Sequence, residues 1–236
     1  MALPPGQKEL EGFPRFGKSL TGIPPVPTER PVIEFRGMGL EPFTVPATDL
    51  LRANRREVVT DFHCVAGWSA TNLRWEGVPF HTVYSETVAP RLEPDTVVTH
   101  LAFRGLDGWR SVLTLDDALN ETVILADRLN GHELDSDHGA PVRLVSPDQY
   151  GYVSTKHLAR IELHSAEPRL HGPSLLDALF MPHPRASVWR EERHRFLPTW
   201  LVRPFFRSLK RPMLFLTARA DTRRQSSVDT HGVAQP

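Results

Sequence analysis

Residues 61–69 of the chain read DFHCVAGWS and contain its only cysteine, Cys64. The residues before the cysteine alternate between two sets. One set is Val58, Thr60, Phe62 and Cys64, and the other is Val59, Asp61 and His63. This period of two predicts a β-strand that ends at the cysteine. Ala66 and Gly67 then permit a sharp turn, because glycine tolerates backbone angles that other residues avoid. We therefore expect Cys64 to face the same way as Phe62, with its sulfur directed into a pocket.

Three interpretations of the lone cysteine are open. Free cysteines are among the most buried residue types and commonly pack as small apolar groups. A cysteine can also bind a soft metal or act as a nucleophile. The nucleophile would need a base within reach. His63 is a poor candidate for that base, because neighbouring residues of a strand point to opposite faces.

The composition bounds the class of protein. In 236 residues, 28 lysines and arginines balance 28 acids, so net charge gives no argument for nucleic-acid binding. With 22 prolines and 15 glycines, we expect short elements joined by many loops. One cysteine excludes an internal disulfide framework. The N-terminus lacks the basic start and apolar run of a secretory signal, so we expect a cytoplasmic protein.

Composition also divides the chain into four stretches. Residues 1–30 are rich in proline and predict an extended arm, 31–165 predict the folded core, 166–221 a basic helical extension, and 222–236 a disordered tail. Within the extension, residues 183–200 predict a basic helix packed on the domain. Residues 197–216 are apolar but interrupted by prolines and basic residues, which excludes a transmembrane helix. This segment either closes the core or contacts anionic lipid or an acidic redox partner.

The core predicts an α+β fold in which mixed short sheets alternate with short helices. Alternating apolar residues predict strands at 31–37, 43–46, 96–104, 109–115 and 123–129. The turn at 105–108 joins two of them as a hairpin, and Asn130-Gly131 predicts another turn. Thr48 is the expected N-cap of a short helix. After Ser69 we expect a short helix or turn before a strand at 73–77.

A second polar stretch contains DHGAPVRLV at 137–145 and YGYVSTKHL at 150–158. This is the composition of an anion cradle, because glycine lets backbone amides approach closely and several side chains donate hydrogen bonds. An arginine can grip a phosphate with two hydrogen bonds, while a lysine acts as a point charge. By spacing alone, Arg143 paired with Asp137, and Lys156 on a solvated edge, is equally compatible.

The runs at 62–69, 73–78, 138–143 and 151–156 together resemble the sulfite oxidase superfamily. The similarity is greatest to the small bacterial molybdopterin-dependent oxidoreductases related to the methionine-sulfoxide reductase catalytic subunit. It covers about residues 12 to 165. The resemblance implies a sulfite-oxidase-type molybdopterin-binding domain in which Cys64 binds molybdenum. A molybdenum–molybdopterin cofactor with one pterin would supply two further sulfurs, and a thiolate suits this soft metal.

The same resemblance implies which residues hold the cofactor. They are His138, Arg143, Ser154, Thr155 and Lys156, with Asp107 at a position that contacts the pterin in sulfite oxidases. An ordinary turn aspartate is the alternative for Asp107. Arg15, in the arm segment 12–17, is a second catalytic candidate beside Cys64, since it could contact an anionic substrate or the cofactor phosphate. A surface arginine is the alternative for Arg15.

The implied function is oxygen-atom transfer on a small sulfur-containing substrate, by sulfite oxidation or by sulfoxide reduction. The family's N-terminal haem domain and its immunoglobulin-like dimerisation domain do not fit this chain, so we expect no haem. Electrons should then pass to a separate electron-transfer protein, with a membrane-associated carrier as one option. The alternatives are a non-catalytic carrier of the cofactor and a cofactor-free interaction protein with the same fold.

Overall fold

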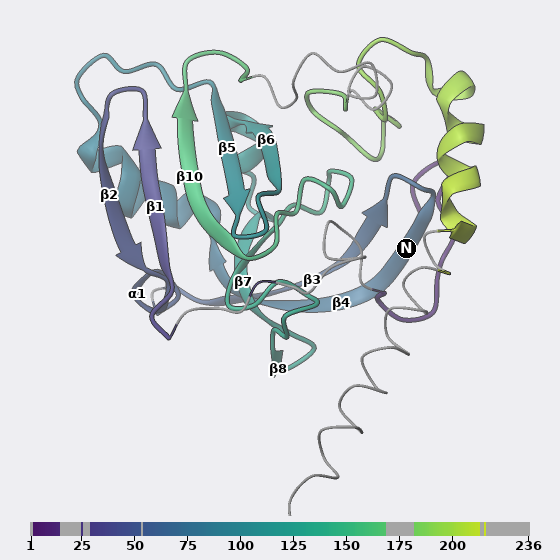
Figure 1. The fold of residues 1–236 in the computed structure, drawn as a ribbon, viewed down its shortest axis with the longest axis horizontal. Coiled ribbons are helices and arrows are strands. Elements are labelled where there is room, and N and C mark those ends of the chain that lie inside the picture. The colour runs from purple at the N-terminus through teal and green to yellow at the C-terminus, as the bar shows by residue number, and fades with distance from the viewer. Residues whose placement is uncertain are drawn as a thin grey trace, which may run out of the picture.

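The computed structural model describes residues 2–14, 25, 29–52, 54–168, 182–212 and 215. These residues form two five-stranded sheets connected by short helical turns (Figure 1). The sheets are mixed and the helices short, as the sequence predicts. Arg15 lies outside the described residues, and so does the tail at 222–236 for which disorder was expected.

The first sheet ties the two ends of the core together. Its strands, in spatial order, are β2 (Leu40–Pro46), β1 (Val32–Gly37), β10 (Leu158–His164), β5 (His100–Gly105) and β6 (Arg110–Thr114). β1 and β10 run parallel, whereas the other pairs are antiparallel. Every second residue faces the main hydrophobic core, where Phe35, Leu101 and Phe103 are fully buried. The hairpin expected between residues 96 and 115 is confirmed as β5 and β6.

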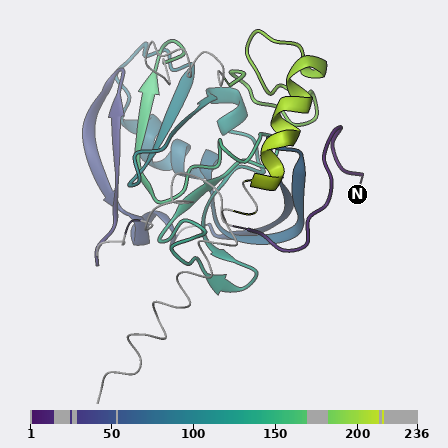
Figure 2. The ribbon, with the colours of Figure 1, turned by 45° about the vertical axis from the view of Figure 1, so that its right-hand side comes forward.

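The second sheet carries the cysteine. Its strands are β3 (Arg56–Cys64), β4 (Trp68–Pro79), β7 (Ile124–Leu129) and β8 (His132–Glu133), and β9 (Arg143–Val145) pairs with β7. β3 and β4 form a long hairpin whose turn lies beside the C-terminal helix in both ribbon views (Figures 1 and 2). At that turn Gly67 has φ +85° and donates its amide to the Cys64 carbonyl at 2.9 Å. The sharp turn after the cysteine strand is thus confirmed.

Short helical turns connect the strands. They are α1 (Ala47–Leu50), α2 (Phe80–Val83), the π-helical turn η2 (Tyr84–Val88), the 3-10 turn η3 (Ala89–Arg91) and α3 (Leu115–Ala118). The N-cap predicted at Thr48 is wrong, because α1 starts directly after Pro46 without a side-chain cap. The helix or turn predicted after Ser69 is also wrong. β4 runs through that region unbroken, since β3 holds its first part and β7 its last.

The C-terminal extension is partly irregular. The helix predicted over 183–200 is wrong for most of that range, where Ala186 and Glu191 adopt positive φ angles that a right-handed helix excludes. A helix forms instead over 199–212, directly after Pro198 (Figure 1). Across the residues that the structure describes, no helix is both long and apolar enough to cross a membrane.

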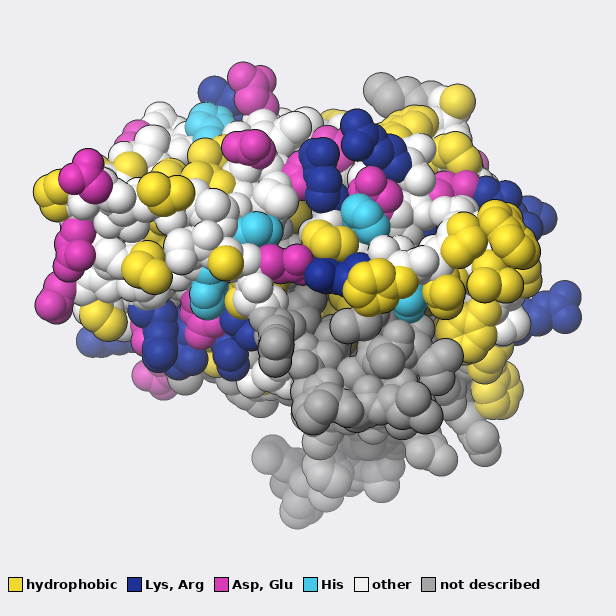
Figure 3. Space-filling view, turned by 90° about the horizontal axis from the view of Figure 1, so that it is seen from above, with side chains coloured by type: hydrophobic (Ala, Val, Ile, Leu, Met, Phe, Trp, Pro, Cys, Tyr) yellow, Lys and Arg dark blue, Asp and Glu magenta, His cyan; other side chains and the backbone are white. Residues whose placement is uncertain are grey.

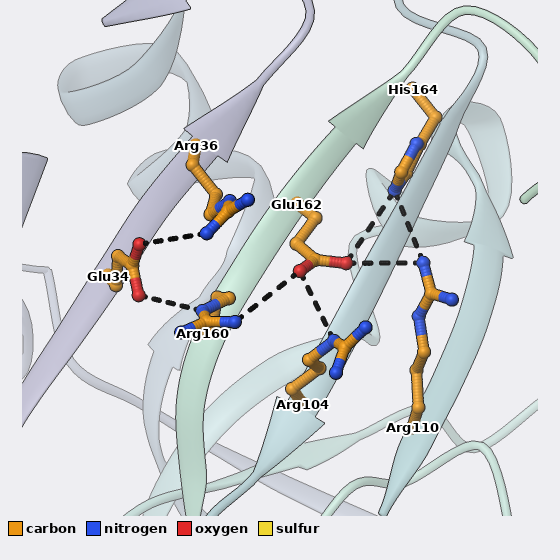
Figure 4. A network of polar contacts seen from close by, with 7 residues as sticks. All are labelled: Glu34, Arg36, Arg104, Arg110, Arg160, Glu162 and His164. Atoms are coloured by element: carbon orange, nitrogen blue, oxygen red, sulfur yellow. Dashed lines mark hydrogen bonds and ion pairs between the residues drawn. The ribbon is translucent and has the colours of Figure 1, made fainter. Parts of the chain in front are cut away.

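The face of the first sheet that points away from the main hydrophobic core carries a row of charged residues (Figure 4). Arg160, Arg104 and Arg110 are direct cross-strand neighbours on β10, β5 and β6. Like charges placed opposite one another destabilise a sheet. Glu162 offsets this repulsion, because its carboxylate lies 3.7, 3.2 and 3.1 Å from these three guanidinium groups. Its side chain is only 10% exposed, so water cannot take over the role.

We predict that Glu162→Gln lowers the free energy of unfolding by about 2 kcal/mol, because it leaves three guanidinium groups side by side without their shared counter-charge. For a chain of this size that corresponds to a fall in melting temperature of roughly 4–8 °C. Glu34→Gln is the matched control, since Glu34 pairs with Arg160 at 2.7 Å but is more exposed. The control should cost less than about 1 kcal/mol. Equal melting temperatures for the two variants would contradict this role of Glu162.

Candidate cofactor site

The two stretches singled out in the sequence share one cavity of about 460 Å³. Cys64, Asp107, Arg143, Ser154 and Lys156 all line it. The sheet order explains this convergence: β7 lies between β4 and β9, so the cysteine hairpin and the 137–158 stretch belong to one sheet. Phe62 also lines the cavity, as expected for a residue on the same side of β3 as Cys64.

Cys64 is a buried thiol with hydrogen-bond donors and a positive charge beside it. Burial raises the pKa of the Cys64 thiol to about 11. Hydrogen bonds from the Ala66 amide and the Trp68 indole, together with the charge of Arg193, act in the opposite direction and lower this pKa. The thiol is therefore protonated at neutral pH. Once a metal displaces the proton, the same donors would stabilise the sulfur ligand.

His63 is directed away from the thiol, as the strand alternation predicts. Its Nδ1 lies 2.7 Å from the hydroxyl oxygen of Ser69 on the neighbouring strand, and burial lowers the pKa of the imidazole. His63 does not line the cavity. The arm reaches the same region, because the Gln7 amide donates to the Cys64 carbonyl at 3.2 Å. A cysteine–histidine nucleophile pair is thus not formed.

Arg143 is a fully buried cation in the cavity wall. Its Nη1 and Nη2 donate to the carbonyls of His138 and Ser154 at 2.9 and 3.1 Å. The guanidinium lies over the Trp75 ring at 5.0 Å. Burial lowers the pKa of Arg143 to about 9, which still leaves it charged at neutral pH.

No ion pair joins Arg143 to a carboxylate within the described part of the chain. The pairing with Asp137 that the spacing allowed is therefore not formed. The Asp137 carbonyl instead accepts a hydrogen bond from Lys156 Nζ at 2.5 Å. Burying an uncompensated cation costs several kcal/mol. An anion in the adjoining cavity would offset that cost.

The remaining predicted residues divide into two groups. Asp107 lines the cavity while its carboxylate accepts from the Trp109 amide at 2.9 Å, as in an ordinary turn. Thr155 and His138 are not among the residues that line the cavity. The Thr155 hydroxyl is 2.7 Å from that of Ser111, and His138 Nε2 is 3.0 Å from the Phe13 carbonyl.

Gly139 explains how this wall packs so closely. Its φ is +108°, and a Cβ there would lie 3.0 Å from Lys156 Cβ and 3.2 Å from Arg143 Cβ. Only glycine combines that backbone angle with such close neighbours. The glycine of the predicted cradle therefore brings two cationic side chains together, rather than presenting its own amide to a ligand.

Several cavity residues were missed by sequence reasoning. Arg193, Phe206 and Leu209 reach the cavity from the C-terminal extension. Arg193 is held by a hydrogen bond to the Val65 carbonyl, next to the cysteine. Nothing local in the sequence signals that this extension folds back over Cys64. Phe13, in the arm segment 12–17, also lines the cavity and contacts Phe62.

Comparison with known proteins identifies the domain. Residues 22–171 match the family described as "Oxidoreductase molybdopterin binding domain". The chain belongs to this family. Its members bind molybdopterin, so the family implies a molybdenum cofactor for the cavity at Cys64.

Two relatives of this chain also carry names of oxidoreductases. The protein-methionine-sulfoxide reductase catalytic subunit MsrP of Pseudomonas syringae pv. tomato is 29% identical over 180 residues, which are 65% of this chain and 51% of MsrP. The uncharacterized oxidoreductase YuiH of Bacillus subtilis is 33% identical over 162 residues, 68% of this chain and 78% of YuiH. The chain thus spans about half the length of the Pseudomonas relative.

A solved structure shares the fold of the family. The sulfane dehydrogenase SoxCD of Paracoccus pantotrophus superposes with a TM-score of 0.50 at 21% identity, over 58% of this chain and 38% of the SoxCD chain. The sulfite-oxidase-type fold expected from the sequence is confirmed by this match and by the family assignment.

Proposed function

We propose that this chain is a molybdenum-cofactor oxidoreductase that transfers an oxygen atom to or from a small sulfur compound. One observation carries the proposal: a lone thiol, Cys64, and a buried guanidinium without a carboxylate partner, Arg143, line the same cavity. A soft metal and an anionic group on one ligand would match these two side chains. When bound, the cofactor would supply the two-electron change and the oxygen transfer.

The residues present fit such a cofactor. Cys64 would hold the metal, while Arg143, Lys156 and Ser154 would hold the anionic end of the pterin. Among the described residues, the bonds to the two carbonyls use two of the four N–H groups on the terminal nitrogens of Arg143, so two N–H groups could bind an anion. The Tyr152 hydroxyl is a further buried donor on the cavity lining, without a hydrogen-bond partner among the described residues. A single pterin and the absence of haem belong to this proposal.

Sulfoxide reduction is the direction that we favour. Phe13, Phe62, Val65, Phe206 and Leu209 give the cavity a largely apolar lining. A neutral thioether or sulfoxide suits such a lining better than sulfite does. In this direction a sulfoxide, two electrons and two protons give a thioether and water. The electrons would come from a separate electron-transfer protein.

Sulfite oxidation is the second candidate, and one observation favours it. Arg110 and Arg193 also line the cavity and could attract a sulfur oxyanion. Arg74 and Arg104 do not line it. Arg110 and Arg193 are each engaged in an ion pair, Arg110 with Glu162 and Arg193 with Glu191. This leaves less positive charge for a substrate.

The deciding experiment uses protein purified from a host that makes molybdopterin. Metal analysis should find about one molybdenum per chain. Reduced viologen with methionine sulfoxide should give turnover, whereas ferricyanide with sulfite should give little. Molybdenum without either activity would support the cofactor-carrier alternative, and a metal-free folded protein would support the interaction-protein alternative. The cytoplasmic location stays a prediction, which cell fractionation would test.

A further inference from the structure

The helix over 199–212 and its flanks carry exposed apolar side chains. Trp200, Leu201 and Phe205 are 73%, 49% and 43% exposed. Phe196 and Leu197, just before the helix, and Phe215, after it, are exposed as well. We call this set the outer face. Figure 3 shows hydrophobic side chains gathered at the end of the molecule where the helix lies in Figure 1.

The same helix has a second apolar stripe, which anchors it to the domain. Val202 and Phe206 are each 6% exposed, and Leu209 lines the cofactor cavity. Their spacing of four and three residues places them on one side of an α-helix. The inner stripe thus packs against the domain while the outer face remains exposed to solvent. Solvent-exposed apolar patches of this kind mark interaction sites.

Basic residues flank the outer face. Arg203, Arg207 and Arg211 follow one another at four-residue intervals, and Lys210 adjoins them. No acidic residue occurs from residue 193 to 212. Arg203 forms an ion pair with Glu191, whereas Arg207 and Arg211 point into solvent. The exposed surface of the helix thus combines aromatic and aliphatic side chains with positive charge.

We propose that the outer face of the helix over 199–212 docks on an anionic membrane surface. Tryptophan, phenylalanine and leucine on one face, beside a purely basic stripe, are the side chains that insert at the boundary between headgroups and acyl chains. Clustered arginine and lysine add attraction to anionic lipids of about 1 kcal/mol each near the surface. An acidic protein could match the charges. It would not by itself account for the exposed Trp200 and its apolar neighbours.

Docking would place the cofactor cavity close to the lipid. Phe206 and Leu209 line the cavity from the inner side of the helix, while Trp200 and Phe205 project from its outer side. The separation is then about one helix diameter, roughly 10 Å. The inference stands on the surface alone and does not depend on the reaction proposed above.

The test is flotation of the full-length, cofactor-loaded protein with vesicles. It should float with vesicles that contain phosphatidylglycerol and not with phosphatidylcholine alone, and high salt should release it. Trp200→Ser with Phe205→Ser, and Arg207→Glu with Arg211→Glu, should each weaken binding by roughly tenfold or more. Val97→Ser and Arg52→Glu, at exposed positions away from the helix, are the matched controls.

Molybdenum content and turnover without vesicles show that each variant is intact, and flotation is scored independently of turnover. The proposal is overturned if the wild type stays unbound at low salt, or if the helix variants float as it does. It is also overturned if sedimentation shows a dimer that Trp200→Ser with Phe205→Ser dissociates, because the outer face would then be a contact between two copies.

Discussion

Cys64→Ser should yield a folded protein that contains almost no molybdenum. Serine keeps the size of the side chain, and its hydroxyl can use the same Ala66 and Trp68 donors that face the sulfur. It cannot replace a thiolate as a soft ligand. We expect metal content and turnover to fall at least a hundredfold, because residues that merely orient a ligand are already worth about 10- to 100-fold. Elemental analysis and a thermal melt measure the two properties separately.

Ser69→Ala is the matched control for this experiment. Ser69 is buried on the neighbouring strand and bonds to His63, but it does not line the cavity. It should lose a little stability and keep its molybdenum. If Cys64→Ser retained full metal and activity, the assignment of Cys64 as the metal ligand would be wrong.

The pH dependence of metal binding gives an independent check on Cys64. The metal-free protein holds a proton on a thiol whose pKa is raised to about 11, and metal binding must release it. Affinity for the cofactor should therefore rise with pH up to about that value. Stability of the metal-free protein should change in the opposite sense. The pKa of Cys64 is higher in the native state than in the unfolded chain, so the protonated thiol adds to the free energy of unfolding below about pH 9. That stabilisation is lost as pH rises from about 9 to about 11.

Much of the site was predictable because its signals are local. The alternation before Cys64 and the glycine after it specify a strand and a turn, and both form. The Asn130-Gly131 turn likewise joins β7 to β8. Placing Cys64 and Arg143 in one cavity needed a long-range pairing through β7, which the family resemblance supplied and the residue pattern did not.

The sequence did not predict the direction of individual side chains or the docking of the C-terminal extension. Thr155 and Lys156 are adjacent in an irregular segment, where no fixed period tells which side chain meets the cavity, and only Lys156 does. The extension contributes Arg193 and Phe206 through tertiary contacts alone. Its amphipathic pattern was visible in the sequence. The sequence could not show that two apolar stripes exist and that one of them closes the cavity.

Arg143 should be required both for the cofactor and for the fold. A residue that only held the cofactor could be replaced by alanine without loss of the fold. Arg143 has a structural role as well, because its guanidinium is fully buried, donates to the carbonyls of His138 and Ser154, and packs on Trp75. Leaving buried acceptors without partners costs about 1–3 kcal/mol each. We expect Arg143→Ala to lower the free energy of unfolding by about 2–3 kcal/mol, measured by urea denaturation, because the two unpaired carbonyls and the lost packing outweigh the cost of burying the cation that the substitution removes.

Arg143→Met separates the two roles. Methionine restores much of the lost volume against Trp75 but carries neither charge nor donors, so it should fold better than alanine and still lack molybdopterin. Thr155→Val is the control from the same wall: Thr155 does not line the cavity, so the loss of its contact with the Ser111 hydroxyl should leave the cofactor in place. Normal molybdopterin in Arg143→Met would refute the anion cradle. Loss of cofactor in a stable Thr155→Val protein would instead restore Thr155 as the ligand that the sequence resemblance implied.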